Sequence, residues 1–509
     1  MKTKFTKNSF KTSNTLLSAL KDSTDTPDVS TANGMAAFSS TDEKVLDFFF
    51  LSGASRNIAE SDIINIFRKA LAENTNLALK ALFYAGDVRE GQGERRLFRI
   101  LTKELYENNY DLFKGLIKFI PEYTRWDNLI YLLRKPGNLS SKKISKNNIE
   151  LEWKDTEIFS EIMKALKNGN GICAKWMPRK GSFFNLLASE MKMPYGKLRK
   201  LLVKLTKEAN TVEQLMCSGN WDKINYSTVS SKAFNIYKKA FYRRDSERFE
   251  KFINKAVNGT AKINTSVLYP VDIVGKYISS YNAVSGIEKK AAIAQWNQLP
   301  DFIGRKSKDE NYLVVADVSG SMSGKPMEVS ISLAMYLSER NSGIFKDAFL
   351  TFSSNPALNI LKGDLFKRIN QLKRADFGRS TDLEKTFKLI LEKAVSNKVP
   401  VSGMPSTIII VSDMEFNQAN GRNSNAAAFE MIEKMYNKAG YKMPKILFWN
   451  VNGRAAMPYP AKGMEKNVGL VSGFSPNILK TVFETLNLTP VDLMRKKLLS
   501  ERYKPIKAV

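Results

Sequence analysis

Five oxygen-bearing side chains in the C-terminal part of the chain have types and spacing that suit a hard metal cation. Two are carboxylates, and three are hydroxyls within or beside short turns. They are Asp317, Ser319, Ser321, Thr381 and Asp413. Mg²⁺ prefers oxygen ligands in near-octahedral geometry and keeps some of its waters. The sequence therefore predicts a site for Mg²⁺ or another divalent hard cation, with a position left for water or for an acidic group of a partner.

The elements that must position these side chains are short apolar strands that alternate with amphipathic helices. The two aspartates follow apolar runs at 312–316 and 407–411. We expect further strands at 348–352, 445–451 and 467–472, helices at 327–340, 383–394 and 426–439, and a last helix opened by Ser475 and Pro476. Such alternation predicts a doubly wound, mostly parallel sheet of the Rossmann-like α/β class. Ligands bind these sheets beyond the carboxyl ends of the strands, so the five oxygens should meet at one edge.

A plainer interpretation of the same residues is a pair of capped turns. Ser319 or Ser321 would then cap a helix, and Asp413 would only form a turn. The chain contains no histidine, so a histidine-dependent catalytic triad and a Cys/His zinc site are both excluded. Any metal should therefore be held by oxygen ligands.

The balance of charge is strongly basic, with a net charge of +28 over 509 residues. The excess is spread evenly, at +17 in residues 1–310 and +11 in residues 311–509. A charge of this size favours polyanions, nucleic acid before an anionic membrane, although a general compositional bias toward lysine would also produce it. There are two cysteines and no long apolar run. We therefore expect free thiols, a cytoplasmic location and no membrane association.

The order of residue types along the chain predicts four parts. Residues 1–40 are polar and should form a flexible tail, and residues 41–305 carry repeated helical periodicity with short loops. Stacked antiparallel helices of this kind indicate a HEAT-like repeat solenoid, with an insertion at 136–155. Residues 306–490 hold the α/β pattern, and residues 491–509 should form a basic tail.

Basic residues lie beside tryptophans in several of the loops between the expected helices. We expect seven of them to bind RNA: Arg89, Arg95, Arg96, Arg125, Lys175, Arg179 and Lys180. Arginine and lysine neutralise phosphates, and neighbouring aromatic rings stack on unpaired bases. Loops on one side of a curved solenoid also converge on its axis. The alternative is structural, with the tryptophans as buried anchors and Arg125 paired with Asp127.

Several motifs together resemble the TROVE proteins that carry a C-terminal von Willebrand A domain, the Ro autoantigen group. The similarity points to an uncharacterised bacterial, phage and plant branch of that group. The residues that carry it are DVREGQGERR (87–96), RWDNL (125–129), AKWMPR (174–179), WDKINYSTVSS (221–231), ADVSGSMSGKPMEVSI (316–331), STDLEKTF (380–387), SDMEF (412–416) and ILFWNV (446–451). The resemblance implies a ring of helical repeats closed by a von Willebrand A domain with a metal-ion-dependent adhesion site. It also implies binding of small structured or misfolded RNA.

Three functions compete on these observations. The preferred one is a non-enzymatic, monomeric ribonucleoprotein component that grips RNA through its basic helical ring. The second is a protein interaction scaffold whose metal captures an acidic residue of a partner, without RNA. The third is a metal-dependent phosphodiesterase, which usually needs a denser group of carboxylates than the one around Asp317.

Overall fold

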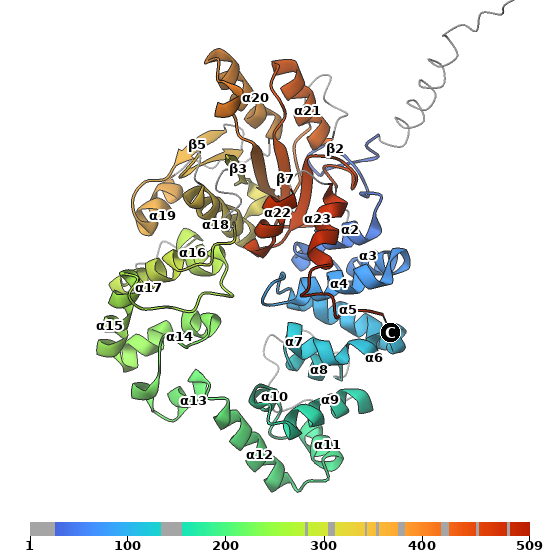
Figure 1. Ribbon diagram of the computed structural model, residues 1–509, viewed down its shortest axis with the longest axis vertical. Helices are drawn as coiled ribbons and strands as arrows, with labels where there is room; N and C mark the ends of the chain where they lie inside the picture. Colours follow the sequence, from blue (N-terminus) through green and yellow to red (C-terminus); the bar gives the residue numbers. More distant parts are fainter. Residues whose placement is uncertain are drawn as a thin grey trace, which may run out of the picture.

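The computed structural model describes residues 26–133, 155–279, 284–303, 311–341, 344–352, 356–374, 382–418, 427–454, 458–485 and 489–508. Helices make up the N-terminal part of the chain, and a six-stranded α/β domain forms the C-terminal part (Figure 1). This is the expected combination of a helical repeat region with a Rossmann-like domain. The predicted insertion at 136–155 and the predicted ligand Thr381 lie outside the described residues, apart from Asp155.

The helical region begins at α2 and runs to α17. Its helices are α2 (Lys44–Ser52), α3 (Glu60–Glu73), α4 (Thr75–Gly86), α5 (Arg95–Asn108), α6 (Tyr110–Leu116), α7 (Ile120–Tyr123), α8 (Asp127–Leu132), α9 (Thr156–Lys167), α10 (Gly171–Trp176), α11 (Ser182–Glu190), α12 (Tyr195–Glu208), α13 (Val212–Cys217), α14 (Ser231–Arg244), α15 (Ser246–Val257), α16 (Pro270–Ser279) and α17 (Gly286–Asn297). Several longer helices bury one apolar stripe, as Phe98, Leu101 and Leu105 do in α5, whereas α2 and α4 are buried on all sides over most of their length. The helices pack mainly on their neighbours in sequence, as a solenoid requires.

The α/β domain contains the strands β3 (Tyr312–Asp317), β4 (Ala348–Phe352), β5 (Ala357–Ile360), β6 (Thr407–Ser412), β7 (Lys445–Asn450) and β8 (Val468–Ser472). Their spatial order is β5-β4-β3-β6-β7-β8, and only β5 runs antiparallel to its neighbour. The order reverses between β3 and β6, which lie side by side in the middle of the sheet. This is the switch point at which doubly wound sheets bind ligands.

Six helices accompany the sheet: α18 (Lys325–Arg340), α19 (Leu365–Arg374), α20 (Leu383–Ser396), α21 (Ala428–Ala439), α22 (Leu479–Thr485) and α23 (Pro490–Leu498). The strands and helices expected from the sequence match β3, β4, β6, β7, β8, α18, α20 and α21 to within a few residues. Ser475 caps the following turn through Asn477 N, as expected. The sequence analysis did not anticipate β5 and α19.

Both ends of the helical region contact the α/β domain, so the described elements form a closed circuit (Figure 1). At one end α2 packs against β8, and at the other end α16 packs against α18. The two ends of the helical region also contact each other directly, since Tyr269 Oη lies 3.4 Å from the carbonyl oxygen of Gln92. Among the described residues, no helix is long and apolar enough to cross a membrane.

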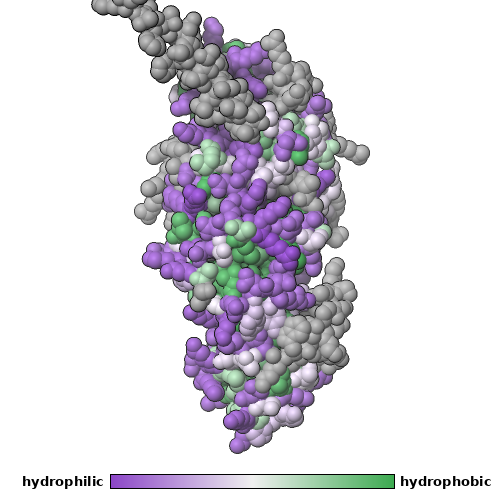
Figure 2. Space-filling view, turned by 90° about the vertical axis from the view of Figure 1, so that its right-hand side faces the viewer, coloured by the Kyte–Doolittle hydropathy of each residue, from purple (hydrophilic) through white to green (hydrophobic). Residues whose placement is uncertain are grey.

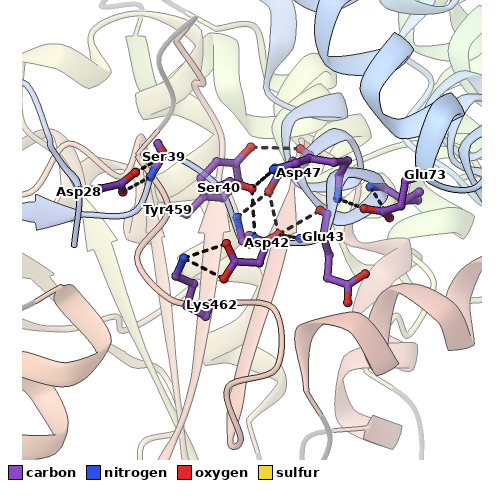
Figure 3. A network of polar contacts seen from close by, with 12 residues as sticks. Asp28, Ser39, Ser40, Asp42, Glu43, Asp47, Glu73, Tyr459 and Lys462 are labelled. Carbon is purple, nitrogen blue, oxygen red and sulfur yellow. Dashed lines mark hydrogen bonds and ion pairs between the residues drawn. The ribbon is translucent and has the colours of Figure 1, made fainter. Parts of the chain in front are cut away.

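The N-terminal segment crosses from the helical region onto the α/β domain. Residues 29–37 form a small hairpin of β1 (Val29–Ser30) and β2 (Ala36–Ala37), and the predicted tail is therefore wrong for residues 26–40. Thr31 Oγ1 donates to the carbonyl of Phe416, and the backbone of Phe38 forms an antiparallel β-bridge with that of Tyr459. Figure 3 shows how the following turn is held, with Lys462 beside Asp42 and with Asp28 accepting from Ser39. Buried Met35 and Phe38 explain why this polar stretch is anchored.

The C-terminal segment makes the reverse crossing, from the α/β domain back to the helices. It was expected to be a basic tail, but α23 begins at Pro490, and Tyr503 and Ile506 are fully buried. Arg502 donates to both oxygens of Asp87, at 2.9 and 3.2 Å, and Tyr503 Oη donates to the same carboxylate at 3.1 Å.

The face around α3 and α6 is largely hydrophilic, with some apolar side chains near its middle (Figure 2).

Candidate metal centre and arginine cluster

The turn after β3 arranges the first three predicted ligands. Asp317 ends the strand, is fully buried, and accepts a hydrogen bond from Ser319 N at 2.9 Å through Oδ1. Its Oδ2 accepts from the Ser412 hydroxyl at 2.6 Å, across the switch point. The hydroxyls of Ser319 and Ser321 lie 3.1 Å apart. The backbone thus closes a tight turn that gathers two hydroxyls beside one carboxylate.

Asp413 comes from the end of β6, the neighbouring strand. Its Oδ1 accepts from Glu415 N at 3.2 Å, and its side chain is almost completely buried. Within the described part of the chain, its Oδ2 is buried and accepts no hydrogen bond. A buried carboxylate oxygen without a donor is costly, and a cation at this position would remove that cost.

The pKa shifts of Asp317 and Asp413 also favour a cation at this edge of the sheet. Burial raises the pKa of Asp317, and the negative charge of Asp413 raises it further. Burial also raises the pKa of Asp413, and the neighbouring Ser321 hydroxyl and Arg454 offset only part of this effect. Two coupled, buried carboxylates at the end of two parallel strands destabilise each other unless a positive charge joins them.

The hydroxyl groups of Ser319 and Ser321 lie beside the two aspartates at this edge of the sheet. Ser319 is buried, whereas Ser321 is exposed and faces solvent. The capped-turn alternative holds only in part: the Ser319 side chain caps nothing and Gly324, not a serine, precedes α18, but Asp413 does form a turn by accepting from Glu415 N. The structure therefore brings Asp317, Ser319, Ser321 and Asp413 together, as predicted. These residues fit a hard divalent cation, since they offer only oxygen ligands.

Two residues beside this edge were not anticipated. Arg454 Nη2 lies 4.0 Å from Asp413 Oδ2, and its Nε lies 3.7 Å from Glu415 Oε1. Glu415 is buried and also accepts from Ala32 N, which belongs to the N-terminal crossing segment. Two buried carboxylates, those of Asp413 and Glu415, thus share one guanidinium. The SDMEF motif contained Glu415, but nothing in the sequence indicated that Arg454 would reach it.

The seven predicted RNA-binding residues have different environments. Arg89 donates to the carbonyl of Glu122, and Arg96 donates to the carbonyl of Ser55. Arg179 donates to the Ala174 carbonyl and to Thr206, so it fixes α10 against α12. Lys175 forms a 3.1 Å ion pair with Glu213. Lys180 is exposed.

Arg95 and Arg125 instead belong to a cluster with Arg99, which the sequence analysis missed. Asp127 accepts from Arg99 at 2.9 Å and from Arg125 at 2.7 Å. Arg95 begins α5 and forms no ion pair within the described residues. Burial, and then the neighbouring Arg125, lowers the pKa of Arg95. Three guanidiniums surround a single carboxylate, and this arginine cluster carries a local excess of two positive charges.

Aromatic rings back two of the three guanidiniums. Arg125 lies 4.5 Å from the ring centroid of Trp176, and Arg99 lies 4.7 Å from that of Tyr131. Stacking on a ring fixes the plane of a guanidinium. The edges of both guanidiniums already donate to protein oxygens, Arg125 to Asp127 and Arg99 to Asp127 and Asn128. The structural alternative for Arg125 is also correct, since it does pair with Asp127. The spacing of Arg95 and Arg99, one helical turn apart, could have revealed the cluster.

Two side chains of the motif DVREGQGERR, those of Asp87 and Gln92, bond directly across the joint with the α/β domain and the C-terminal segment. Gln92 Nε2 donates to the carbonyl of Ser472 at 2.8 Å. Gly473 and Gly53 approach so closely that a Cβ atom on Gly53 would lie 2.6 Å from Gly473 Cα. Glu94 pairs with Arg56, whose guanidinium lies 3.3 Å from the ring of Phe474. This loop is therefore mainly an interdomain contact.

The chain is thus a helical circuit closed by an α/β domain, with two buried aspartates at the switch point of the sheet. Residues 311–503 match a domain of unknown function (DUF7788), and residues 31–109 and 188–308 match another (DUF2828). The chain is 28% identical to the uncharacterised protein L728 of Acanthamoeba polyphaga mimivirus over 499 residues, which cover 91% of this chain and 86% of that protein. The Ro (RSR) protein of Deinococcus radiodurans is 12% identical with a TM-score of 0.36, over 87% of this chain and 99% of that chain.

Proposed function

We propose that this protein is a non-enzymatic RNA-binding protein whose helical circuit holds single-stranded parts of small structured or misfolded RNA. The observation that carries the proposal is the arginine cluster, where Arg99 and Arg125 share the Asp127 carboxylate and Arg95 lies nearby with no ion pair among the described residues. Phosphate would supply the negative charge that the cluster lacks, and guanidinium groups bind phosphate oxygens in a bidentate manner. The motifs that resemble the Ro group support the same ligand class.

The charge of the whole chain supports a polyanion as the partner. A net charge of +28 attracts any nucleic acid and accelerates its association. The aromatic rings of Trp176 and Tyr131 lie at the cluster, and such rings are common in sites for unpaired strands. Helical duplexes offer fewer such contacts, because their bases are stacked on one another.

We further propose that Asp317, Ser319, Ser321 and Asp413 hold Mg²⁺ or a similar divalent cation, and that Thr381 adds a hydroxyl. The support is the buried, unsatisfied Oδ2 of Asp413 beside a second buried carboxylate. When bound, the cation would neutralise both aspartates and offer a vacant position to a water or to an acidic group of a partner. The role of this centre is structure or partner recruitment, and it carries no catalytic step.

Binding of a fluorescein-labelled single-stranded RNA, measured by fluorescence anisotropy, tests the RNA proposal. The wild type should bind, and Arg95→Glu should weaken binding by at least tenfold because it places a negative charge in the cluster. Arg96→Glu is the matched control, since the Arg96 guanidinium contacts the Ser55 carbonyl instead of the cluster. Equal affinities for wild type and Arg95→Glu would refute the cluster as the site. The absorbance ratio at 260 and 280 nm before and after ribonuclease treatment would show whether RNA copurifies.

A further inference from the structure

A pocket of about 290 Å³ lies where α10 meets the loops around α13 and η4 (Trp221–Lys223). Lys175 lines this pocket, and Trp176, the next residue of α10, stacks on Arg125. One short helix therefore connects the two features. A strand held by its phosphates at the cluster would bring its neighbouring nucleotide close to the pocket.

The size and the lining suit one flat ring system. A volume of about 290 Å³ is at the lower end of small-ligand pockets, so it admits one small group and no large cofactor. Ile172, Val212 and Val229 contribute apolar surface, and Ile172 is 49% exposed. An exposed isoleucine beside a polar pocket offers a face on which a base can lie.

Polar groups with both donor and acceptor capacity also line the pocket. They are the amides of Asn210 and Asn225 and the hydroxyl of Ser230. Asn225 Oδ1 accepts from Ser227 N at 3.1 Å, and its Nδ2 donates to no described residue. Recognition of the edge of an unpaired base requires such mixed donors and acceptors. Of the two lysines that line the pocket, Lys175 is paired with Glu213, and Lys223 is exposed.

The wall formed by residues 221–224 is fixed before any ligand arrives. Arg248 donates to the carbonyls of Trp221, Asp222 and Ile224, at 3.1, 2.5 and 2.7 Å. Ile224 and Val229 belong to a hydrophobic core that is separate from the core containing Cys173 and Ala174. The pocket thus lies at the boundary between two hydrophobic cores, and the three hydrogen bonds from Arg248 order one side of it, which lowers the entropy lost on binding.

We propose that this pocket accepts one unstacked nucleobase of the RNA whose phosphates the arginine cluster holds. The proposal rests on the proposed function and adds a base-specific contact to it. Ser230→Phe fills the pocket from an exposed position that caps no backbone group through its side chain. Ser227→Phe is the matched control, because Ser227 is exposed in the same loop but does not line the pocket.

The experiment compares a short single-stranded RNA with an otherwise identical strand that lacks its bases, by fluorescence anisotropy. Stacking and edge contacts to one base should account for roughly a tenfold preference for the intact strand. Ser230→Phe should reduce that preference by about this factor and leave the salt dependence unchanged. Ser227→Phe should keep the preference.

Two failures remain distinguishable. If the wild type binds neither strand, the proposed function itself is wrong. If the wild type binds RNA through Arg95, but Ser230→Phe keeps the full preference for the intact strand, the base pocket is wrong and the RNA-binding proposal stands. Circular dichroism of Ser230→Phe should match the wild type, which ensures that any loss comes from the filled pocket.

Discussion

The turn 317–321 and the loop 87–96 are both short, polar and dense in versatile side chains, but the fold uses them differently. In the turn, the end of β3 leaves one carboxylate and two hydroxyls at an open edge, with Ser321 exposed. In the loop, Asp87 is fully buried against Arg502, and Gln92 is hydrogen-bonded to Ser472. A polar motif at the end of a parallel strand is available for ligands, whereas the same kind of motif at a domain boundary is consumed by packing.

The largest effect should come from breaking the joint at Arg502. Arg502→Ala leaves the buried Asp87 carboxylate without its guanidinium, and loss of one partner of a buried pair typically costs about 3–5 kcal/mol. We expect the first transition in urea-induced unfolding, followed by tryptophan fluorescence, to shift to lower urea. Lys504→Ala is the control, because among the described residues Lys504 pairs only with exposed Glu501. Identical midpoints for Arg502→Ala and the wild type would show that the joint does not depend on this pair.

At the metal edge, in contrast, a substitution should weaken Mg²⁺ binding without destabilising the metal-free protein. Asp317→Ala removes one of two buried, mutually repelling carboxylates, so the variant in EDTA should be at least as stable as the wild type. At a Mg²⁺ concentration of about 100 times the dissociation constant, the wild type should gain about 2.7 kcal/mol, and Asp317→Ala should gain nothing. Isothermal titration and thermal unfolding measure both quantities.

Ser323→Ala is the control for the metal experiment, because Ser323 lies in the same turn and donates to the Gly320 carbonyl. It should bind Mg²⁺ like the wild type. Unchanged Mg²⁺ affinity in Asp317→Ala would remove the assignment of this edge as a metal centre.

A smaller effect concerns the pH dependence of the joint. Burial raises the pKa of Glu94 to about 7, against the opposing influence of Arg56. The folded protein therefore retains a proton that the unfolded chain has lost, and this contribution to stability falls as pH rises from about 4.5 to about 7. Between about pH 5 and about pH 8, the free energy of unfolding of Glu94→Gln should therefore fall by about 1–2 kcal/mol less than that of the wild type.

Urea unfolding at the two pH values measures this difference. Glu90→Gln in the same loop is the control, because the Glu90 side chain is exposed. If Glu94→Gln and the wild type lose stability equally over this range, Glu94 does not hold its proton in the folded state.

The metal edge could be predicted from sequence because its geometry follows from strand periodicity. An apolar run that ends in Asp317 and another that ends next to Asp413 must meet at the same edge if they are neighbours in a parallel sheet. Arg454 could not be predicted, since it reaches the edge from the loop after β7. The two terminal segments also escaped prediction, because their few buried residues, such as Phe38 and Tyr503, carry no periodic signal.

The environments of the basic residues could not be predicted from the sequence either. Sequence position placed seven cationic residues in loops, but Arg95 and Arg96 begin α5 and Lys175 lies in α10. Only the tertiary contacts separate Arg95 and Arg125, in the cluster, from Arg96 and Arg179, which bind carbonyls. Arg99 was missed because it lies within α5 and not in a loop. Whether the seven face one common channel stays a prediction.

The smallest expected effect separates two neighbouring arginines on the RNA. Arg95 contributes to the cluster, whereas Arg96 donates to the Ser55 carbonyl and lies 3.9 Å from Glu60. Each phosphate that a protein neutralises on a single strand contributes roughly 0.7 to the slope of the logarithm of affinity against the logarithm of salt concentration. Arg95→Ala should therefore lower this slope by about 0.7 and weaken all sequences alike, while Arg96→Ala should leave it unchanged. Anisotropy titrations over a range of KCl concentrations measure the slopes. If Arg96→Ala lowered the slope and Arg95→Ala did not, the RNA would follow the loop 87–96 past the joint and not the arginine cluster.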